Sequence, residues 1–594
     1  MAQLRAPGLG PIVGHTTEKS CRIWIRAGDP EDEGVHLSSE RRTIGVIAVV
    51  KINGKAIPKE KGQVFYFRLH REYDRTGTFN LGKETGLDEK SKPIILKAAT
   101  EYEVRVGTLT LDDPARDDAV VSSAKISDFL PKADPSIWWD ELMALRENRS
   151  VATFRTFPVE TKTKSGPLSF IMGSCRYPGI LWKIKEADEI FGPLLKEAQG
   201  KDPTADEQES KGRKPQKKAR RPVEFVLMAG DQIYADMLNR SVPLGRADTF
   251  EEFQERYLTA YGSRNMRKLL RNVPTYMILD DHEIEDNWHQ DRIEQAAARR
   301  VFNMAINAYM SYQWSHCPRD FLPWLYYSFQ CGAYPFFVLD TRTQRYIDDI
   351  EESLEDNNLL GRPTRGRGEP SQLERLVAWL KRCQKERGDL PKFVVSSSVF
   401  VPSPMSARTG RRGEPQLEVT DPKMIEAMND SDSWPAFPST RREILRAIID
   451  DKIQNVIFLS GDIHCSNVAE MRFTRKGKDL GLKAFSITSS AFYWPFPFAD
   501  GAPANFVHDS TDEKERDSFL ISLDEVMDYT AWNFTQVDNY CRVDLDRQKA
   551  TLTVCPYDYQ GNPIHDREWW GGEGKKKLEA TLRLAPWKDA GSRG

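Results

Sequence analysis

Five runs of apolar residues each break off at side chains that can bind a metal ion. They read SFIMGSC, VEFVLMAGDQIY, TYMILDDHE, FFVLDTR and NVIFLSGDIH, and they cover residues 169–175, 223–234, 275–283, 336–342 and 455–464. Short apolar runs without alternation are typical of strands that are buried on both faces. Because an open α/β sheet binds its ligands just beyond the carboxyl ends of its strands, we expect the five ends to converge on one site.

The first part of the chain has a different pattern, in which apolar and polar residues alternate in short segments separated by turns. Such segments cover residues 21–28, 42–54, 63–71, 100–111 and 151–158. A period of two residues with frequent turns is typical of an antiparallel β-sandwich. We therefore predict an N-terminal β-sandwich domain over residues 1–162.

Beyond that point the apolar runs alternate with amphipathic segments of helical periodicity, at residues 179–198, 249–261 and 371–386. Strands that alternate with helices are typical of an α/β domain, which we place at residues 163–594. Two polar segments, within residues 201–221 and 361–370, are expected to be loops that could control access to the site. Residues 531–558 alternate like a strand pair, and the tail after Gly571 is expected to be peripheral.

The composition is that of an ordinary soluble protein, with 39% hydrophobic residues, 29% charged residues and a formal net charge of −3. This charge gives no reason to expect nucleic acid or an anionic membrane, so a small molecule is the expected partner. No secretory signal and no apolar segment of roughly 18 residues is evident, which predicts a cytoplasmic protein without a membrane span. The eight cysteines form no CxxC pair, so we expect buried thiols.

Carboxylates and histidines follow three of the apolar runs. The combination of the three motifs is more informative than any one of them alone. A lone Gly-Asp after a strand is commonly a helix cap. Here GDQIY, DDHE and GDIH place oxygen and nitrogen ligands after three separate strands. Such a set is what a two-metal phosphoester site requires.

The same motifs resemble those of PhoD-like alkaline phosphatases, a branch of the calcineurin-like metallophosphoesterases. They are GSCR (173–176), AGDQIYAD (229–236), LDDHEIEDNW (279–288), LDTR (339–342) and SGDIHCS (460–466), and residues 10–26 resemble the β-sandwich leader of that family. The resemblance implies a four-layer α/β metallophosphoesterase sandwich, with mixed sheets flanked by helices, behind the N-terminal antiparallel β-sandwich. It also implies that residues 163–594 form the catalytic domain.

By this resemblance, Asp231 is the carboxylate that bridges two metal ions. Tyr234 supplies a phenolate, Cys175 a thiolate and His464 an imidazole to the first ion, which the resemblance implies is Fe³⁺. Considered apart from the family resemblance, Cys175 would be an inert buried thiol, and Tyr234 would be an aromatic residue packed under a loop.

The second ion is expected to bind Asp281, Asn287 and Asp462, and Asp280 could exchange roles with Asp281. The resemblance implies Ca²⁺ here, and an oxygen-rich ligand set also suits Mn²⁺ or Mg²⁺ better than zinc. Asn287 read alone is an ordinary turn residue.

The expected reaction is attack of a metal-bound hydroxide on phosphorus. By the same resemblance, His282 is the expected general acid or phosphate contact. Arg176 is preferred to Arg342 as the guanidinium that neutralises the developing charge. Arg342 is an alternative phosphate clamp or a structural ion-pair partner, and His289 could face the substrate. The aromatic run at 492–498 could line the leaving-group pocket or belong to the core or an interface.

These observations predict a phosphomonoesterase that acts on a small-molecule phosphate ester. The alternative enzyme is a phosphodiesterase for phospholipid or nucleotide diesters, because substrate choice depends on loops. A non-catalytic metal-binding interaction protein is the alternative of another class. The oligomeric state is not readable from the sequence.

Overall fold

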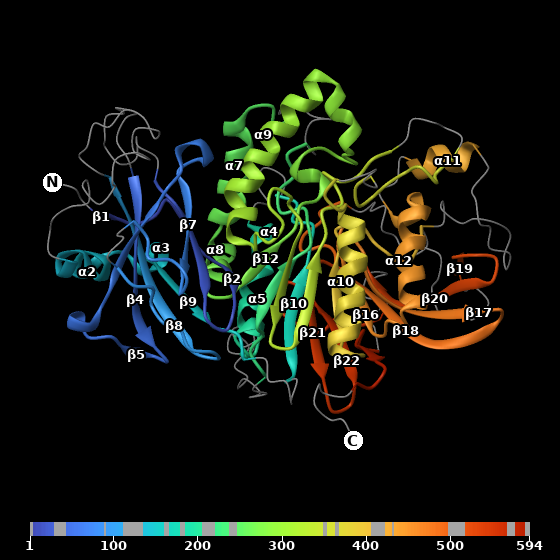
Figure 1. Ribbon diagram of the computed structural model, residues 1–594. Helices are drawn as coiled ribbons and strands as arrows, with labels where there is room; N and C mark the ends of the chain where they lie inside the picture. Colours follow the sequence, from blue (N-terminus) through green and yellow to red (C-terminus); the bar gives the residue numbers. More distant parts are fainter. Residues whose placement is uncertain are drawn as a thin grey trace.

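The structure is a computed structural model that describes most of the 594 residues. The described residues are 4–28, 43–87, 91–110, 135–159, 166–178, 185–204, 220–236, 246–347, 353–362, 368–404, 422–429, 433–496, 517–566 and 576–587. Figure 1 shows the N-terminal sheets at one side of the molecule and strands β17 to β20 at the other.

Two antiparallel sheets form the N-terminal part. One has six strands, namely β1 (Leu4–Arg5), β8 (Glu101–Thr110), β4 (Thr43–Ile52), β5 (Lys55–Ala56), β6 (Val64–Arg68) and β9 (Val151–Arg155). The other has three, namely β2 (Leu9–Thr16), β3 (Cys21–Arg26) and β7 (Thr76–Leu81). Their facing side chains form one core, so the predicted antiparallel sandwich is present.

The alternation along β3 shows why this sandwich also joins the rest of the molecule. Cys21, Ile23 and Ile25 face the other N-terminal sheet. Trp24 points the opposite way, and its indole N–H donates to the Ser311 carbonyl at 2.8 Å. One strand therefore contributes to two cores, because successive side chains of a strand point to opposite faces. The predicted boundary at residue 162 stays a prediction.

Two mixed sheets form the centre. The first has the order β12 (Thr275–Met277), β11 (Phe225–Met228), β10 (Leu168–Gly173), β21 (Tyr540–Asp546), β22 (Thr551–Tyr557) and β23 (Ala580–Arg583). The second has the order β13 (Tyr327–Cys331), β14 (Tyr334–Val338), β15 (Lys392–Val395), β16 (Val456–Ser460), β18 (Lys478–Thr488), β17 (Ser466–Arg475), β20 (Glu525–Thr535) and β19 (Asp517–Leu520). Strands β10, β11 and β12 are parallel to one another, and so are β14, β15, β16 and β18.

Helices cover the outer face of each central sheet. Those on the first sheet are α5 (Phe191–Ala198), α7 (Phe250–Gly262), α8 (Arg264–Leu270) and α9 (Ala296–Tyr312), and those on the second are α10 (Gln372–Arg387), α11 (Pro422–Asn429) and α12 (Pro438–Asp450). Apolar residues of both sheets fill the space between them, including Phe170, Phe225, Phe336 and Phe393. The chain thus has the predicted four-layer α/β sandwich.

The remaining described helices are shorter or peripheral. They are α2 (Pro135–Ala144), α3 (Glu147–Ser150), α4 (Glu186–Glu189) and the 3₁₀ turns η1 (Lys59–Lys61), η2 (Arg71–Tyr73), η4 (Asp281–Glu283), η5 (Gln290–Glu294), η6 (Trp314–His316) and η8 (Trp434–Ala436). Helix α10 begins at a capping box in which Ser371 and Glu374 exchange hydrogen bonds, which is the local signal that ends the preceding loop.

Several sequence predictions can be compared with these elements. All five apolar runs contain strands, namely β10, β11, β12, β14 and β16, and residues 531–558 contain the antiparallel pair β21 and β22. The expected peripheral tail is wrong, because β23 adds a strand to the first central sheet and buries Leu582. The expected gating loops lie largely outside the described residues.

No helix among the described residues is long and apolar enough to cross a membrane. All eight cysteines are buried free thiols, as predicted from their spacing.

Candidate metal centre

The five strand ends meet at one place between the two central sheets. Cys175 follows β10, and its Sγ lies 3.4 Å from Asp231 Oδ2, which follows β11. The same Sγ lies 3.3 Å from the carbonyl oxygen of Asp462, which follows β16. Arg342 follows β14 and donates through Nε to Asp280 Oδ1, beyond β12, at 2.5 Å. The convergence expected from the sequence is therefore confirmed, although the strands belong to two facing sheets.

The backbone is left-handed at five of the predicted metal ligands. The φ angles are +56° at Cys175, +56° at Asp231, +57° at Asn287, +69° at Asp462 and +50° at His464. Residues other than glycine rarely adopt this conformation, which costs of order 1 kcal/mol or more at each position. The surrounding packing holds these strand ends in turns that aim several side chains at one point.

The first group of candidate ligands is mixed in chemistry. One ligand atom each from Cys175, Asp231 and His464 lies within 4.8 Å of the others. The Tyr234 hydroxyl lies 3.3 Å from both Asp231 Oδ2 and His464 Nε2. A sulfur, a nitrogen, a phenol oxygen and a carboxylate oxygen thus surround a small volume.

The second group consists of carboxylates. Oxygens of Asp231, Asp280, Asp281 and Asp462 lie within 4.8 Å of one another, and Asp231 belongs to both groups. The Arg342 guanidinium lies 2.5 Å from Asp280 Oδ1 and 3.4 Å from Asp281 Oδ1. His282 forms a further group with Asp231 and Asp281, so its ring also reaches this cluster.

Burial and mutual repulsion shift the pKa values of these groups in opposite directions. Burial, together with Cys175 and the neighbouring carboxylates, raises the pKa of Asp231 well above its usual range. Burial also acts to raise the pKa of Asp281, but Arg342, His282 and the Asn287 amide outweigh it and hold this pKa at about 2. Burial raises the pKa of the Cys175 thiol to about 12 and lowers that of His464 to about 3. A bound cation would favour the charged form of each acid.

One observation tests directly whether these residues suit a cation. Asp231 is 1% exposed, and its Oδ1 has no hydrogen-bond donor among the described residues. A buried carboxylate oxygen without a donor is costly, whereas a metal ion satisfies it. The donors therefore fit a pair of cations that share Asp231.

Comparison with known proteins agrees with this geometry. A family model described as PhoD-like phosphatase matches residues 213–553, more than half of the chain. The chain belongs to the PhoD-like phosphatase family. A solved structure described as the structure of PhoD matches with a TM-score of 0.55 over 94% of this chain and 89% of that chain. At 14% identity it shows the shared fold alone, and the search of curated proteins finds no match.

Membership of the PhoD-like family assigns the chain to the metal-dependent phosphoesterases, a class of hydrolases whose substrates are phosphate esters. The potential metal cluster in the described residues agrees with that class.

Glu283 is a residue of this PhoD-like site that the sequence analysis missed. Its side chain is fully buried and accepts the backbone N–H of Asp231 at 3.2 Å, of Gln232 at 2.7 Å and of Asp280 at 2.9 Å. It also accepts from Gln313 Nε2 at 3.0 Å. One carboxylate thus ties the end of β11 to the end of β12. Its place directly after His282 in the DDHE motif was the available signal.

Two further polar residues orient predicted site residues and were also missed. Asp236 Oδ1 lies 2.8 Å from His282 Nδ1, so Nε2 is the ring nitrogen left for another partner. Burial acts to lower the pKa of His282, but Asp236 and Asp281 outweigh it and raise this pKa to about 10. The Ser490 hydroxyl accepts the backbone N–H of His464 at 3.0 Å and lies 3.1 Å from Cys175 Sγ.

The structure does not bring every predicted residue of the PhoD-like site to the cluster. The Arg176 guanidinium donates to Ser263 Oγ at 3.2 Å and lies over the Phe191 ring, so these contacts give no support for preferring it to Arg342. His289 Nδ1 lies 3.6 Å from Asp291, outside the cluster. Asn287 is half-buried, and its backbone N–H donates to Asp281 Oδ2 at 2.6 Å.

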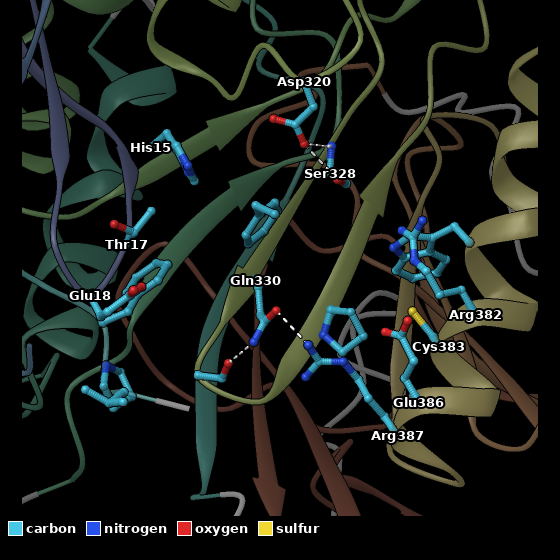
Figure 2. A pocket seen from close by; sticks show the side chains of 17 residues that line it. His15, Thr17, Glu18, Asp320, Ser328, Gln330, Arg382, Cys383, Glu386 and Arg387 are labelled. Carbon is cyan, nitrogen blue, oxygen red and sulfur yellow. Dashed lines mark hydrogen bonds between the residues drawn. The ribbon is translucent and has the colours of Figure 1, made fainter. Parts of the chain in front are cut away.

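A hollow of about 530 Å³ lies away from the metal cluster, where the N-terminal sandwich meets β13, β14 and α10. Figure 2 shows Gln330 of β13 between Glu18 on one side and Arg387 of α10 on the other. Pro335, at the start of β14, lines it, whereas Arg342 follows the end of that strand. The residues that line the hollow and those that form the cluster do not overlap.

Proposed function

We propose that this PhoD-like phosphatase is a phosphomonoesterase of the alkaline phosphatase type that uses Fe³⁺ and Ca²⁺. The observation that carries the proposal is the sharing of Asp231 by two groups of candidate ligands. A carboxylate with one oxygen directed to each of two cations is the arrangement that two-metal hydrolysis of phosphate esters needs.

Donor chemistry supports the choice of metals. Cys175, Tyr234 and His464 supply a thiol, a phenol and an imidazole, which suit a transition metal such as iron better than calcium. Asp280, Asp281 and Asp462 supply hard oxygen atoms, which suit Ca²⁺, with Mn²⁺ or Mg²⁺ as the next choices. We place Asn287 beside this second group, because its backbone already contacts Asp281.

When bound, the cations lower the pKa of a water molecule and offset charge on the phosphate. The side chains of the protein position the metal ligands and the proton donor. Arg342 holds Asp280 and Asp281 in place and offsets part of their charge. Asp236 fixes the ring of His282, whose other nitrogen then protonates the leaving oxygen of the ester.

The proposal is tested with p-nitrophenyl phosphate beside bis-p-nitrophenyl phosphate at alkaline pH, together with the metal content of the purified protein. We expect turnover of the monoester, loss of turnover in Asp231→Asn, and near wild-type rates in the control Asp528→Asn, which changes a half-buried carboxyl on β20. Turnover of the diester alone would establish the phosphodiesterase instead. Metal binding without turnover of either ester would favour the non-catalytic metal-binding protein.

A further inference from the structure

A cluster of aromatic rings borders the metal centre, and of its members only Tyr234 has a part in the reaction described above. It contains Tyr177, Tyr234 and Tyr493, with Trp494 and Phe496 packed against them. Tyr177 lies 5.1 Å from Phe496 and 5.7 Å from Trp494 between ring centroids, and both pairs meet edge to face. The residues come from two strand ends and from the aromatic run that begins at 492.

The cluster is continuous with the candidate catalytic groups. The ring of His464 stacks on Trp494 at 3.6 Å and 15°. The ring of Tyr234 lies 4.4 Å from that of His282 and 6.0 Å from that of Trp494. A leaving oxygen that receives a proton from His282 therefore lies next to aromatic surface.

The exposed fraction of the rings increases from the metal centre outward, as expected for a site that a ligand enters from solvent. Tyr177 and Tyr234 are 1% and 3% exposed, whereas Trp494 and Phe496 are only partly buried. His464 covers one face of the Trp494 indole, and the Phe496 ring meets that indole edge to face at 5.0 Å between ring centroids. The outer rings thus present apolar surface to solvent at the edge of the metal centre.

We propose that Trp494 and Phe496, supported by Tyr177, form a subsite for a leaving group that carries a planar aromatic ring. This inference rests on the proposed phosphoesterase activity and names its substrate class. Rings fixed in edge-to-face contact offer flat, rigid surfaces, and a planar ring stacks on such surfaces with little loss of conformational freedom. The aromatic part of a substrate could be an aryl alcohol or a nucleobase.

Phe496→Leu is the most direct test, because it keeps an apolar side chain, removes a ring and leaves the ring contact of His464 with Trp494 in place. The values of kcat/KM are compared for phenyl phosphate, adenosine 5′-monophosphate and glycerol 2-phosphate. Each substrate serves as its own reference, so differences in leaving-group reactivity cancel. We expect kcat/KM for an aromatic ester to fall about three- to tenfold, which corresponds to the strength of a single aromatic contact. The value for glycerol 2-phosphate is expected to stay within about twofold.

The matched control is Phe519→Leu, which removes a half-buried ring of β19, the end strand of the second central sheet, where the Arg441 guanidinium lies over this ring. It should change none of the three values. A second variant, Trp494→Leu, is assayed together with metal content, because Trp494 also covers a candidate metal ligand.

The outcomes separate the two proposals. A selective fall for phenyl phosphate indicates an aryl ring close to the ester, and a selective fall for adenosine monophosphate indicates a nucleobase; either supports the subsite. Equal falls for all three esters, or no fall, overturn it. If the wild-type protein hydrolyses none of the esters, the proposed activity itself fails before any variant is compared.

Discussion

The metal cluster and the hollow in Figure 2 are lined by different residues and differ in how their charged groups are arranged. At the cluster, Asp231, Asp280 and Asp281 are nearly without solvent exposure and lie close together. In the hollow, Asp320 accepts from Ser328, and Arg387 donates to Gln330 and to the Ala333 carbonyl. The left-handed turns at Cys175, Asp231 and Asp462 and the closely spaced buried acids are at the cluster. Closely spaced buried charge therefore favours the cluster as the site of the proposed chemistry.

Removal of the metals should produce the largest contrast. Four carboxylates within 4.8 Å of one another repel when no cation lies between them. We expect dialysis against a chelator to lower phosphatase activity by at least about a hundredfold and to lower the unfolding temperature, because a ligand at about 1,000 times its Kd contributes about 4 kcal/mol. Activity and thermal unfolding are measured before and after iron and calcium are restored. Full activity in a protein shown to be free of metal would contradict the two-metal site.

A pair of cysteines gives a matched comparison of the two regions. Cys175 belongs to the cluster, and Cys383 lines the hollow; both are buried. We expect Cys175→Ser to lower kcat by about a hundredfold and to reduce bound iron, because a hydroxyl replaces a soft sulfur ligand. Cys383→Ser should leave kcat and metal content unchanged. Equal effects of the two substitutions would mean that Cys175 is only a packed thiol.

Two buried or half-buried arginines provide a smaller contrast. Arg342 contacts two carboxylates of the cluster, whereas Arg387 contacts uncharged oxygens at the hollow. Lysine carries the charge but not the planar fork that engages both acids. We expect Arg342→Lys to lower kcat/KM about tenfold and Arg387→Lys to lower it less than twofold. Steady-state kinetics with p-nitrophenyl phosphate measure both, and a stronger effect at Arg387 would reverse the assignment.

The smallest expected effect concerns stability on the side of the hollow. His316 is fully buried beside the N-terminal sandwich, next to Gly14, and burial lowers its pKa to about 3. In the unfolded chain this histidine takes up a proton near pH 6.5, whereas in the folded protein it stays neutral down to about pH 3. The free energy of unfolding therefore decreases as the pH falls from about 6.5 toward 3.

We expect His316→Asn to flatten this loss by about 1 kcal/mol per pH unit. Urea unfolding at pH 7.5 and 5.5 measures the slope in the wild type and the variant. Phosphatase activity at alkaline pH should stay unchanged, since the group is neutral there in both states. An unaltered slope would show that His316 is not the responsible histidine.

The predictions made from the sequence succeeded where the pattern was local. Apolar runs that end in Gly-Asp or Asp-Asp-His predicted β10, β11, β12, β14 and β16, because burial on both faces imposes its signature on consecutive residues. They failed for the tail, where β23 has only four residues and alternates buried with exposed positions. A short edge strand carries too few apolar residues to stand out from a polar context.

The sequence by itself determined the residue types of the site and the four-layer class of the fold. Only the tertiary structure decided that Arg342 rather than Arg176 contacts the acids, that Glu283 links two strand ends, and that Asp236 holds His282. A side chain placed after a strand can turn toward either side, and the hydrogen bonds that fix Arg176, His282 and Arg342 come from residues 46 to 87 positions away. Long-range packing therefore decides which residues contact one another in the site, while the local sequence pattern decides which residues are candidates for it.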